Sequence, residues 1–180
     1  MTKAAIQGIR GSYSEEAASK YFGDDVEITE CVSFDEAFGS VRAGLADFAV
    51  IPQRNSIIGD IRSTVKLLET CGMRRIDEID IEIEHVLAGT PGSSIENITS
   101  VYSHIEALRQ CSAFFASNPH LSQVPGSDTA SSVRSVVMDR LQLCAAICSK
   151  RAADIYGARI LNQHVANATD NRTTFAIIGN

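Results

Sequence analysis

The chain has 180 residues, of which 44% are hydrophobic and 21% are charged, and its formal net charge is −6. These values fit a soluble globular protein of one domain or two small lobes, with enough apolar side chains for a core. The negative charge argues against a nucleic-acid-binding surface. No apolar run approaches the roughly 20 residues of a membrane span, and the N-terminus has no signal-peptide pattern. We therefore expect neither a nucleic-acid nor a membrane partner.

The five cysteines are odd in number and include no C-x-x-C pair. Cys144 and Cys148 are four residues apart, but no histidine cluster accompanies them. Because disulfides are rare in reducing compartments, we interpret all five as reduced thiols in a cytoplasmic protein. The sequence shows no metal-binding cluster and no cofactor fingerprint, so we expect neither a metal nor a cofactor.

The N-terminal part of the chain predicts alternating strands and helices. Short apolar strands are expected at Ala4 to Gln7 and at Val26 to Cys31. Each is followed by the S-x-x-E pattern of a helix capping box, at residues 12–15 and 33–36. Two strand–helix units followed by a third strand predict a parallel sheet with right-handed crossovers.

The stretch Asp47 to Gly59, DFAVIPQRNSIIG, carries the third strand and a polar loop. The apolar run Phe48 to Ile51 predicts a buried strand, and Pro52 is expected to end it because proline has no backbone N–H to donate. Asn55 and Ser56 are good helix N-caps, and a helix is expected after them. A helix N-terminus at the end of a strand suits an anionic ligand. An ordinary capped loop fits the spacing equally well.

The segment Ile79 to Leu87 begins with isoleucines that alternate with acidic residues over 79–84, and it predicts a strand with one solvated face, near a sheet edge or between lobes. A second α/β lobe is expected to follow. Its strands are predicted at 100–103, around Val124, at 143–148 and at 160–161, with helices opened by His104, by 127–129 and by Ser149. A last strand is predicted at Phe175 to Ile178.

Five stretches, taken together, resemble a known family. They are Gly8 to Ala18 (GIRGSYSEEAA), Ser33 to Pro52, Asn55 to Gly59 (NSIIG), Ser103 to Cys111 (SHIEALRQC) and Asn171 to Phe175 (NRTTF). In that order they resemble the prephenate dehydratase motifs G-x-x-G-[ST]-[FY]-S-x-x-A-A, S-F-D-E…V-x-x-G-x-A-D-F-A-V-x-P, N-S-x-x-G, S-H-P-Q-A-L-x-Q-C and N-x-T-R-F. Each motif is weak alone, but five in the right order cover essentially the whole chain.

This resemblance implies an α/β fold of two lobes, similar to periplasmic binding proteins of type II. Each lobe would be a mixed, mainly parallel sheet flanked by helices, with the active site in the cleft between the lobes. We expect lobe 1 at residues 1–77 and 164–180 and lobe 2 at 78–163, so that the chain crosses near Asp77 and Gln163. No room remains after Asn180 for the family's regulatory domain, so we expect neither that domain nor control by phenylalanine through it. We expect a homodimer.

Family members convert prephenate to phenylpyruvate, with loss of carbon dioxide and water. The resemblance therefore implies prephenate, a small dicarboxylate, as the substrate. It implies Thr173 as the hydrogen-bond donor to the departing hydroxyl, with Ser12 as a second catalytic candidate. Helix N-termini with polar caps would suit the two carboxylates. The substrate-binding candidates are Arg54, Asn55, Ser56, Gly59, Ser103, His104, Thr129, Ala130, Asn171, Thr174 and Phe175.

The sequence departs from the family pattern at charged positions. Thr174 stands where T-R-F has its arginine, and Arg54 stands where P-I-E-N-S has its glutamate. Arginine can hold a carboxylate bidentately, and threonine cannot. Arg54 and Arg172 are candidates to replace the missing charge, Arg172 because side chains two apart on a strand share a face. The alternative, that both arginines are solvated surface residues, fits the sequence equally well.

Two alternatives to a dehydratase remain open. A non-aromatising prephenate decarboxylase would keep the ring hydroxyl and protonate a ring carbon. A small-carboxylate-binding module would have lost the chemistry. Thr173 argues for the dehydratase and the lost arginine against it, so we favour the dehydratase narrowly.

Overall fold

The computed structural model describes residues 1–180 of the chain. These residues form two compact units, Met1–Ile83 with Asp170–Asn180, and Glu84–Thr169. The chain therefore passes from one unit to the other at 83/84 and returns at 169/170. No helix is long and apolar enough to cross a membrane.

Both crossings lie later in the chain than we expected. Asp77 is inside strand β5 (Arg74–Glu82), which belongs to the sheet of the first unit along its whole length. Beyond Gln163, the side chain of Val165 is buried in the core of the second unit, and the backbone N–H of Asn167 donates to Gln110 at 2.7 Å. Packing and hydrogen bonding thus hold the segment up to Thr169 in the second unit.

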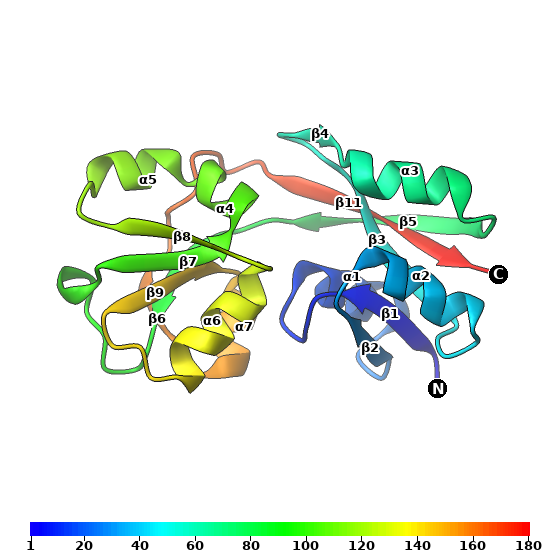
Figure 1. Ribbon diagram of the computed structural model, residues 1–180, viewed down its shortest axis with the longest axis horizontal. Coiled ribbons are helices and arrows are strands. Elements are labelled where there is room, and N and C mark those ends of the chain that lie inside the picture. The colour runs from blue at the N-terminus through cyan, green and yellow to red at the C-terminus, as the bar shows by residue number, and fades with distance from the viewer. The chain divides into compact units, whose positions relative to one another are not determined.

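The first unit is a mixed sheet covered by helices (Figure 1). Its elements are β1 (Lys3–Gln7), α1 (Tyr13–Phe22), β2 (Glu27–Cys31), α2 (Phe34–Arg42), β3 (Phe48–Asn55), β4 (Gly59–Asp60), α3 (Arg62–Thr70), β5 (Arg74–Glu82) and β11 (Arg172–Gly179). The strand order is β2-β1-β3-β11-β5, with β4 paired to β3. Strands β2, β1 and β3 are parallel, as predicted, whereas β11 runs antiparallel to both of its neighbours.

The two predicted capping boxes are confirmed. The hydroxyl of Ser12 accepts from the backbone N–H of Glu15 at 3.3 Å, and that of Ser33 accepts from Glu36 at 3.2 Å. Each glutamate reaches back to a backbone N–H just before the helix, Gly11 for Glu15 and Val32 for Glu36. These bonds satisfy N–H groups that the helix itself leaves without partners, and they fix where α1 and α2 begin.

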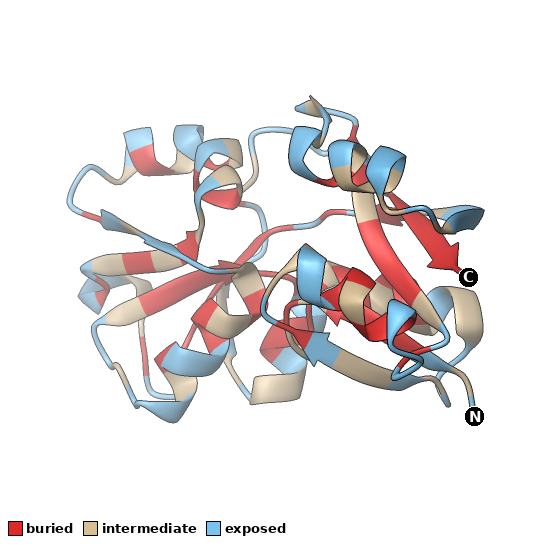
Figure 2. Ribbon diagram, turned by 45° about the vertical axis from the view of Figure 1, so that its right-hand side comes forward, coloured by how far each residue is buried: buried red, intermediate tan, exposed pale blue.

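Alternating residues of the first sheet belong to two buried hydrophobic clusters, one on each face. Much of the sheet is coloured as buried in Figure 2. Val50 and Phe175 belong to the cluster that includes Ala17 and Ala18 of α1. Their chain neighbours belong to the other cluster, which takes in α2 and the partly buried leucines of α3. Successive side chains of a strand point to opposite faces, so adjacent residues of β3 and β11 meet different surroundings.

The prediction that Pro52 ends the third strand is wrong, because β3 continues to Asn55. In the pairing of β3 with β11, Arg54 lies opposite Thr174 and Pro52 lies opposite Phe175, which leaves Gln53 as an extra residue. This is a β-bulge, one of the places where a strand tolerates a proline.

The prediction that Asn55 and Ser56 cap a helix is also wrong. Helix α3 begins at Arg62 and its N-cap residue is Ile61, which makes no side-chain capping bond. Asn55 instead pairs with Gly59 across a tight turn into β4. Gly59 has φ +78°, a conformation that side chains disfavour, so glycine suits the end of this turn.

The alternating segment Ile79 to Leu87 does not form one strand. It is divided between β5, which ends at Glu82 in the first sheet, and β6 (Val86–Gly89) in the second. The expectation of a wet face near a sheet edge is confirmed for β5, because this strand lies at the edge and exposes Asp80 and Glu82 while it buries Ile81.

The second unit is a five-stranded mixed sheet with helices. Its elements are β6 (Val86–Gly89), a 3-10 turn (Ile95–Asn97), β7 (Ser100–His104), α4 (Ile105–Gln110), α5 (Ser112–Ser117), β8 (Ser122–Gly126), α6 (Thr129–Met138), β9 (Cys144–Cys148), α7 (Lys150–Tyr156) and β10 (Arg159–Asn162). The order is β10-β6-β9-β7-β8, in which β7 runs parallel to β8 and β9.

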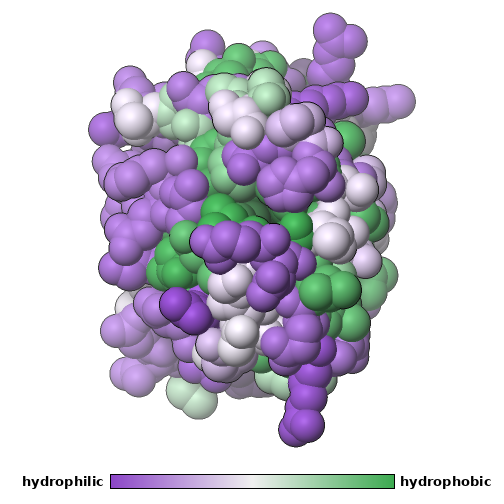
Figure 3. Space-filling view, turned by 90° about the vertical axis from the view of Figure 1, so that its left-hand side faces the viewer, coloured by the Kyte–Doolittle hydropathy of each residue, from purple (hydrophilic) through white to green (hydrophobic).

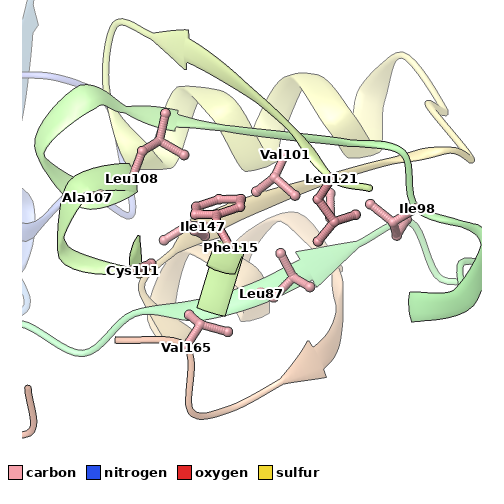
Figure 4. Packing of buried hydrophobic residues seen from close by; sticks show 11 residues of the cluster. Leu87, Ile98, Val101, Ala107, Leu108, Cys111, Phe115, Leu121, Ile147 and Val165 are labelled. Carbon is pink, nitrogen blue, oxygen red and sulfur yellow. The ribbon is translucent and has the colours of Figure 1, made fainter. Parts of the chain in front are cut away.

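One face of this second sheet carries a core built around Leu87, Val101, Leu108, Phe115 and Ile147 (Figure 4). Hydrophobic residues also reach the surface at the end of the unit that carries α5, in a band among hydrophilic ones (Figure 3). Exposed apolar residues are ordinary on folded proteins, so the buried set is what defines the packing.

Leu108 provides a test of this packing. Its side chain is 1% exposed, so Leu108→Ala should lower the free energy of unfolding by about 2–5 kcal/mol, through lost burial and the cavity left behind. Leu143, which is 56% exposed, is the matched control. Leu143→Ala should change the free energy of unfolding by less than about 0.5 kcal/mol. Denaturant titration measures both, and equal losses would contradict the assigned core.

Candidate functional site

Three residues predicted from the sequence come to one end of the first sheet. Because β1 and β3 are parallel, their carboxyl ends lie at the same end of the sheet, and the antiparallel β11 begins there. Ser12 caps the helix that follows β1, Asn55 ends β3, and Thr173 is the second residue of β11. All three residues are buried, with relative exposures of 7%, 4% and 7%.

The side-chain amide of Asn55 connects β3 to the start of β11. Its Nδ2 lies 2.9 Å from Thr173 Oγ1, 2.7 Å from Asn171 Oδ1 and 3.0 Å from the carbonyl oxygen of Arg172. Its Oδ1 accepts from the backbone N–H groups of Ile57 at 2.9 Å and Ile58 at 3.2 Å. One buried amide therefore holds both the turn that follows it and the segment that carries Thr173.

Ser56 strengthens the same connection through the backbone. Its N–H donates to the carbonyl of Arg172 at 2.8 Å, and its hydroxyl accepts from the Arg172 N–H at 2.9 Å. The hydroxyl also donates to the carbonyl of Asp170 at 3.3 Å. The turn at 55–59 and the segment at 170–173 thus form one hydrogen-bonded structure.

The polar residues of β3 and β11 are divided between the two faces of the sheet. Thr173 lies opposite Asn55, and Thr174 lies opposite Arg54, in the β11–β3 register. Directly paired residues share a face and successive residues alternate. Arg54 and Thr174 therefore face away from Thr173 and Asn55. Phe175 returns to the Thr173 side, where it is buried in the core under α1.

Arg54 and Thr174 line a separate pocket of about 520 Å³ on this second face, under α3. Glu78 lies at its wall, where Gln53 Nε2 donates to its carboxylate at 3.0 Å. Arg75 pairs with the same carboxylate. The charged groups of this pocket are largely engaged with one another.

The remaining predicted residues lie in the second unit, where β7 and β8 end together. His104 lies opposite Gly126 in their parallel register, and its Nδ1 accepts from the N–H of Glu106 at 3.2 Å. Thr129 begins α6 and Ala130 is fully buried. Ser103, also fully buried, donates its hydroxyl proton to the carbonyl of Ile147 on β9 at 2.7 Å.

Comparison with known proteins identifies the family. The model for prephenate dehydratase matches residues 4–180. The chain belongs to the prephenate dehydratase family. An arogenate dehydratase/prephenate dehydratase of Arabidopsis thaliana is 34% identical over 176 residues, which is 98% of this chain and 46% of that protein. The chain thus spans about half the length of that curated relative.

Solved structures agree with the fold. A prephenate dehydratase from Arthrobacter aurescens, solved with L-Phe, superposes with a TM-score of 0.90 at 28% identity over 99% of this chain and 60% of that chain. A nutrient-binding protein from Burkholderia cenocepacia, solved with methionine, gives a TM-score of 0.54 at 8% identity over 99% of this chain and 85% of that chain. The second likeness concerns the fold alone, and it shows the expected resemblance to periplasmic binding proteins.

The structure explains one departure from the motifs of the prephenate dehydratase family. Thr174, which replaces the arginine of T-R-F, donates to Asp80 Oδ1 on β5 at 2.6 Å. Arg172 shares this face, as expected for residues two apart, and lies 3.4 Å from Glu82 and 3.5 Å from Asp170. Arg54 lies 3.7 Å from Asp60. Each residue has a partner on the face opposite Thr173, so the geometry does not support a shared role with Thr173 in holding one carboxylate.

Sequence reasoning missed His85, just inside the second unit. Its side chain is buried, and its Nε2 lies 2.9 Å from Oε1 of Gln110, within the motif that ends in Cys111. Burial lowers the pKa of His85, which favours the neutral imidazole at neutral pH. An isolated histidine in the sequence carries no signal of this pairing.

Two of the buried cysteines are not suited to nucleophilic chemistry. Burial raises the pKa of both Cys111 and Cys148 to about 12, so both are thiols at neutral pH. The structure contains no group of three or more His, Cys, Asp or Glu side chains arranged to hold a metal.

A substitution of Arg54 tests whether this residue lies on the face of the sheet opposite Thr173. Arg54→Gln should change the KM of a substrate that binds beside Thr173 by less than about twofold, because an exposed ion pair on the opposite face of the sheet contributes little. Arg62→Gln, at an exposed position on α3, is the matched control. A tenfold rise in KM confined to Arg54→Gln would show that Arg54 reaches the substrate.

Proposed function

We propose that this chain converts prephenate to phenylpyruvate, with loss of carbon dioxide and water. The observation that carries the proposal is Thr173, which lies at the start of β11 within the residues that the family model matches and is hydrogen-bonded to Asn55. In this reaction the bond from the ring to its carboxylate breaks, and its electron pair completes the aromatic ring. The ring hydroxyl leaves and takes up a proton to become water.

Thr173 has the role of a positioned hydrogen-bond donor to the departing oxygen. A threonine hydroxyl is a weak acid in water, so its contribution depends on a fixed position and on exclusion of solvent. Its 7% exposure and its place on a strand paired on both sides meet these conditions. Ser12, the buried cap of α1, remains a candidate beside it.

Polar groups at strand ends support binding of a dicarboxylate. Helix α1 begins at this end of the first sheet, and α6 begins at the end of β8 in the second. The free N–H groups in the first turn of a helix favour negative charge. Ser56, Gly59, Ser103, His104, Thr129, Ala130 and Asn171 keep a binding role as a proposal, whereas Arg54 and Thr174 face away from Thr173 and Phe175 is part of the core.

A non-aromatising decarboxylase is the second candidate, and one observation favours it. Thr174 replaces the family arginine, and its hydroxyl is bound to Asp80. The Arabidopsis relative is named as a dehydratase of arogenate as well as of prephenate, so arogenate is a further candidate substrate.

We propose that the chain acts as a homodimer in the cytoplasm, without a nucleic-acid or membrane partner. The five cysteines form no disulfide and the net charge is −6, which supports a reducing compartment and argues against nucleic acid. Light scattering of the purified chain measures the mass, and a monomer at micromolar concentration would contradict the dimer.

Product analysis separates the candidate functions. The purified chain is incubated with prephenate and, separately, with arogenate, and the ultraviolet spectrum and products are followed. Phenylpyruvate from prephenate supports the dehydratase. A hydroxylated, non-aromatic dihydro product would identify the decarboxylase, and binding without turnover would leave a binding module.

Thr173 should dominate the kinetics. Thr173→Ala should lower kcat by about 10²-fold with little change in KM, because the lost hydrogen bond forms in the transition state. Thr173→Ser, which keeps a hydroxyl, should retain much of the activity. Near-wild-type rates for Thr173→Ala would remove Thr173 from the mechanism.

A further inference from the structure

The amide of Asn55 has only one orientation that fits its surroundings. Its oxygen accepts from the backbone N–H groups of Ile57 and Ile58, and its nitrogen faces the carbonyl oxygen of Arg172. Rotating the amide by 180° would set N–H against N–H at the turn and oxygen against oxygen at Arg172. Main-chain groups of known polarity therefore determine which end of the amide meets Thr173.

This orientation determines the hydrogen-bonding role of Thr173. The Asn55 Nδ2 can only donate, and its two protons are shared among Asn171 Oδ1, the Arg172 carbonyl and Thr173 Oγ1. The Thr173 hydroxyl, 2.9 Å away, can therefore only accept from this group. A hydroxyl has a single proton, and that proton cannot point toward the donor it accepts from. The hydrogen bond from Asn55 is the one side-chain hydrogen bond that the Thr173 hydroxyl makes within the chain, and it leaves the hydroxyl proton for an external acceptor.

We propose that Asn55 is a positioning residue that keeps Thr173 a hydrogen-bond donor to the substrate. Asn55 reaches the reacting atoms only through Thr173, because its own oxygen and nitrogen are engaged within the chain at 4% residue exposure. The inference rests on the proposed function and replaces direct substrate contact as the role of Asn55. Its physical basis is that a donor fixed before the reaction needs no reorientation as charge develops on the leaving oxygen.

The substitution Asn55→Asp reverses this polarity at constant shape. The carboxylate oxygens can still accept from Ile57 and Ile58, so the turn keeps its partners. The other oxygen would also lie against the Arg172 carbonyl and Asn171 Oδ1, so the stability of the variant is measured beside its activity. An oxygen now faces Thr173, and the hydroxyl proton turns toward it and away from the substrate. We expect kcat to fall by about 10²-fold and KM to change by less than about threefold.

A double-mutant cycle separates positioning from direct contact and from a structural role. In the Thr173→Ala background, Asn55→Asp should lower kcat by less than about threefold, because the group it acts through is gone. If Asn55→Asp again lowers kcat by about 10²-fold in the Thr173→Ala background, the two effects are independent and the proposal is overturned. An effect confined to KM would also overturn it, since it would restore direct substrate contact.

Two control variants separate a loss of stability from a loss of kcat. Thr64→Val removes another buried hydroxyl of the first unit, bonded to the carbonyls of Pro52 and Ile61, and should lower stability without lowering kcat of the folded protein. If Asn55→Asp does not fold, Asn55→Ser takes its place in the cycle, because serine can accept at the turn but is too short to reach Thr173. A wild-type chain that does not turn over prephenate would overturn the proposed function, whereas an active wild type with independent, multiplying effects would overturn only the positioning role.

Discussion

The pairing of β11 with strands on both of its sides is the constraint on which the first unit depends. Residues 172–179 lie between β3 and β5 and contribute Phe175, Ala176, Ile177 and Ile178 to the cores on the two faces. A central strand has no free edge, so its register is fixed by hydrogen bonds on both sides and by side chains packed above and below. This placement brings Thr173 beside Asn55, which is 118 residues earlier in the chain.

The same register gives neighbouring motif residues different surroundings. In the segment 171–175, Thr173 and Phe175 point to the face covered by α1, whereas Arg172 and Thr174 point to the opposite face and pair with acids of β5. The bulge at Gln53 keeps this alternation in register as β3 continues past Pro52. A substitution at Thr174 therefore alters a surface remote from the Thr173 hydroxyl, although the two residues are adjacent in sequence.

Polar residues gather at strand ends in both units, but much of their hydrogen bonding is internal. Ser103 is bonded to a carbonyl of the neighbouring strand, and His104 and Asp128 cap helices. Such bonds satisfy backbone groups that would otherwise be costly to bury. A polar residue at the end of a strand is thus a functional candidate only after its internal partners have been taken into account.

The sequence by itself determined the family, the strand–helix alternation and most of the helix starts, because these depend on local patterns. Capping boxes at Ser12 and Ser33 and the apolar runs of the strands are readable from neighbouring residues. Only the tertiary structure decided that β3 passes Pro52, that Asn55 is a buried connection and not a helix cap, and that Arg54 faces away from Thr173. Each of these depends on which strand lies beside β3 and in what register. That information is not present in any local stretch, because the partner strand comes from the other end of the chain.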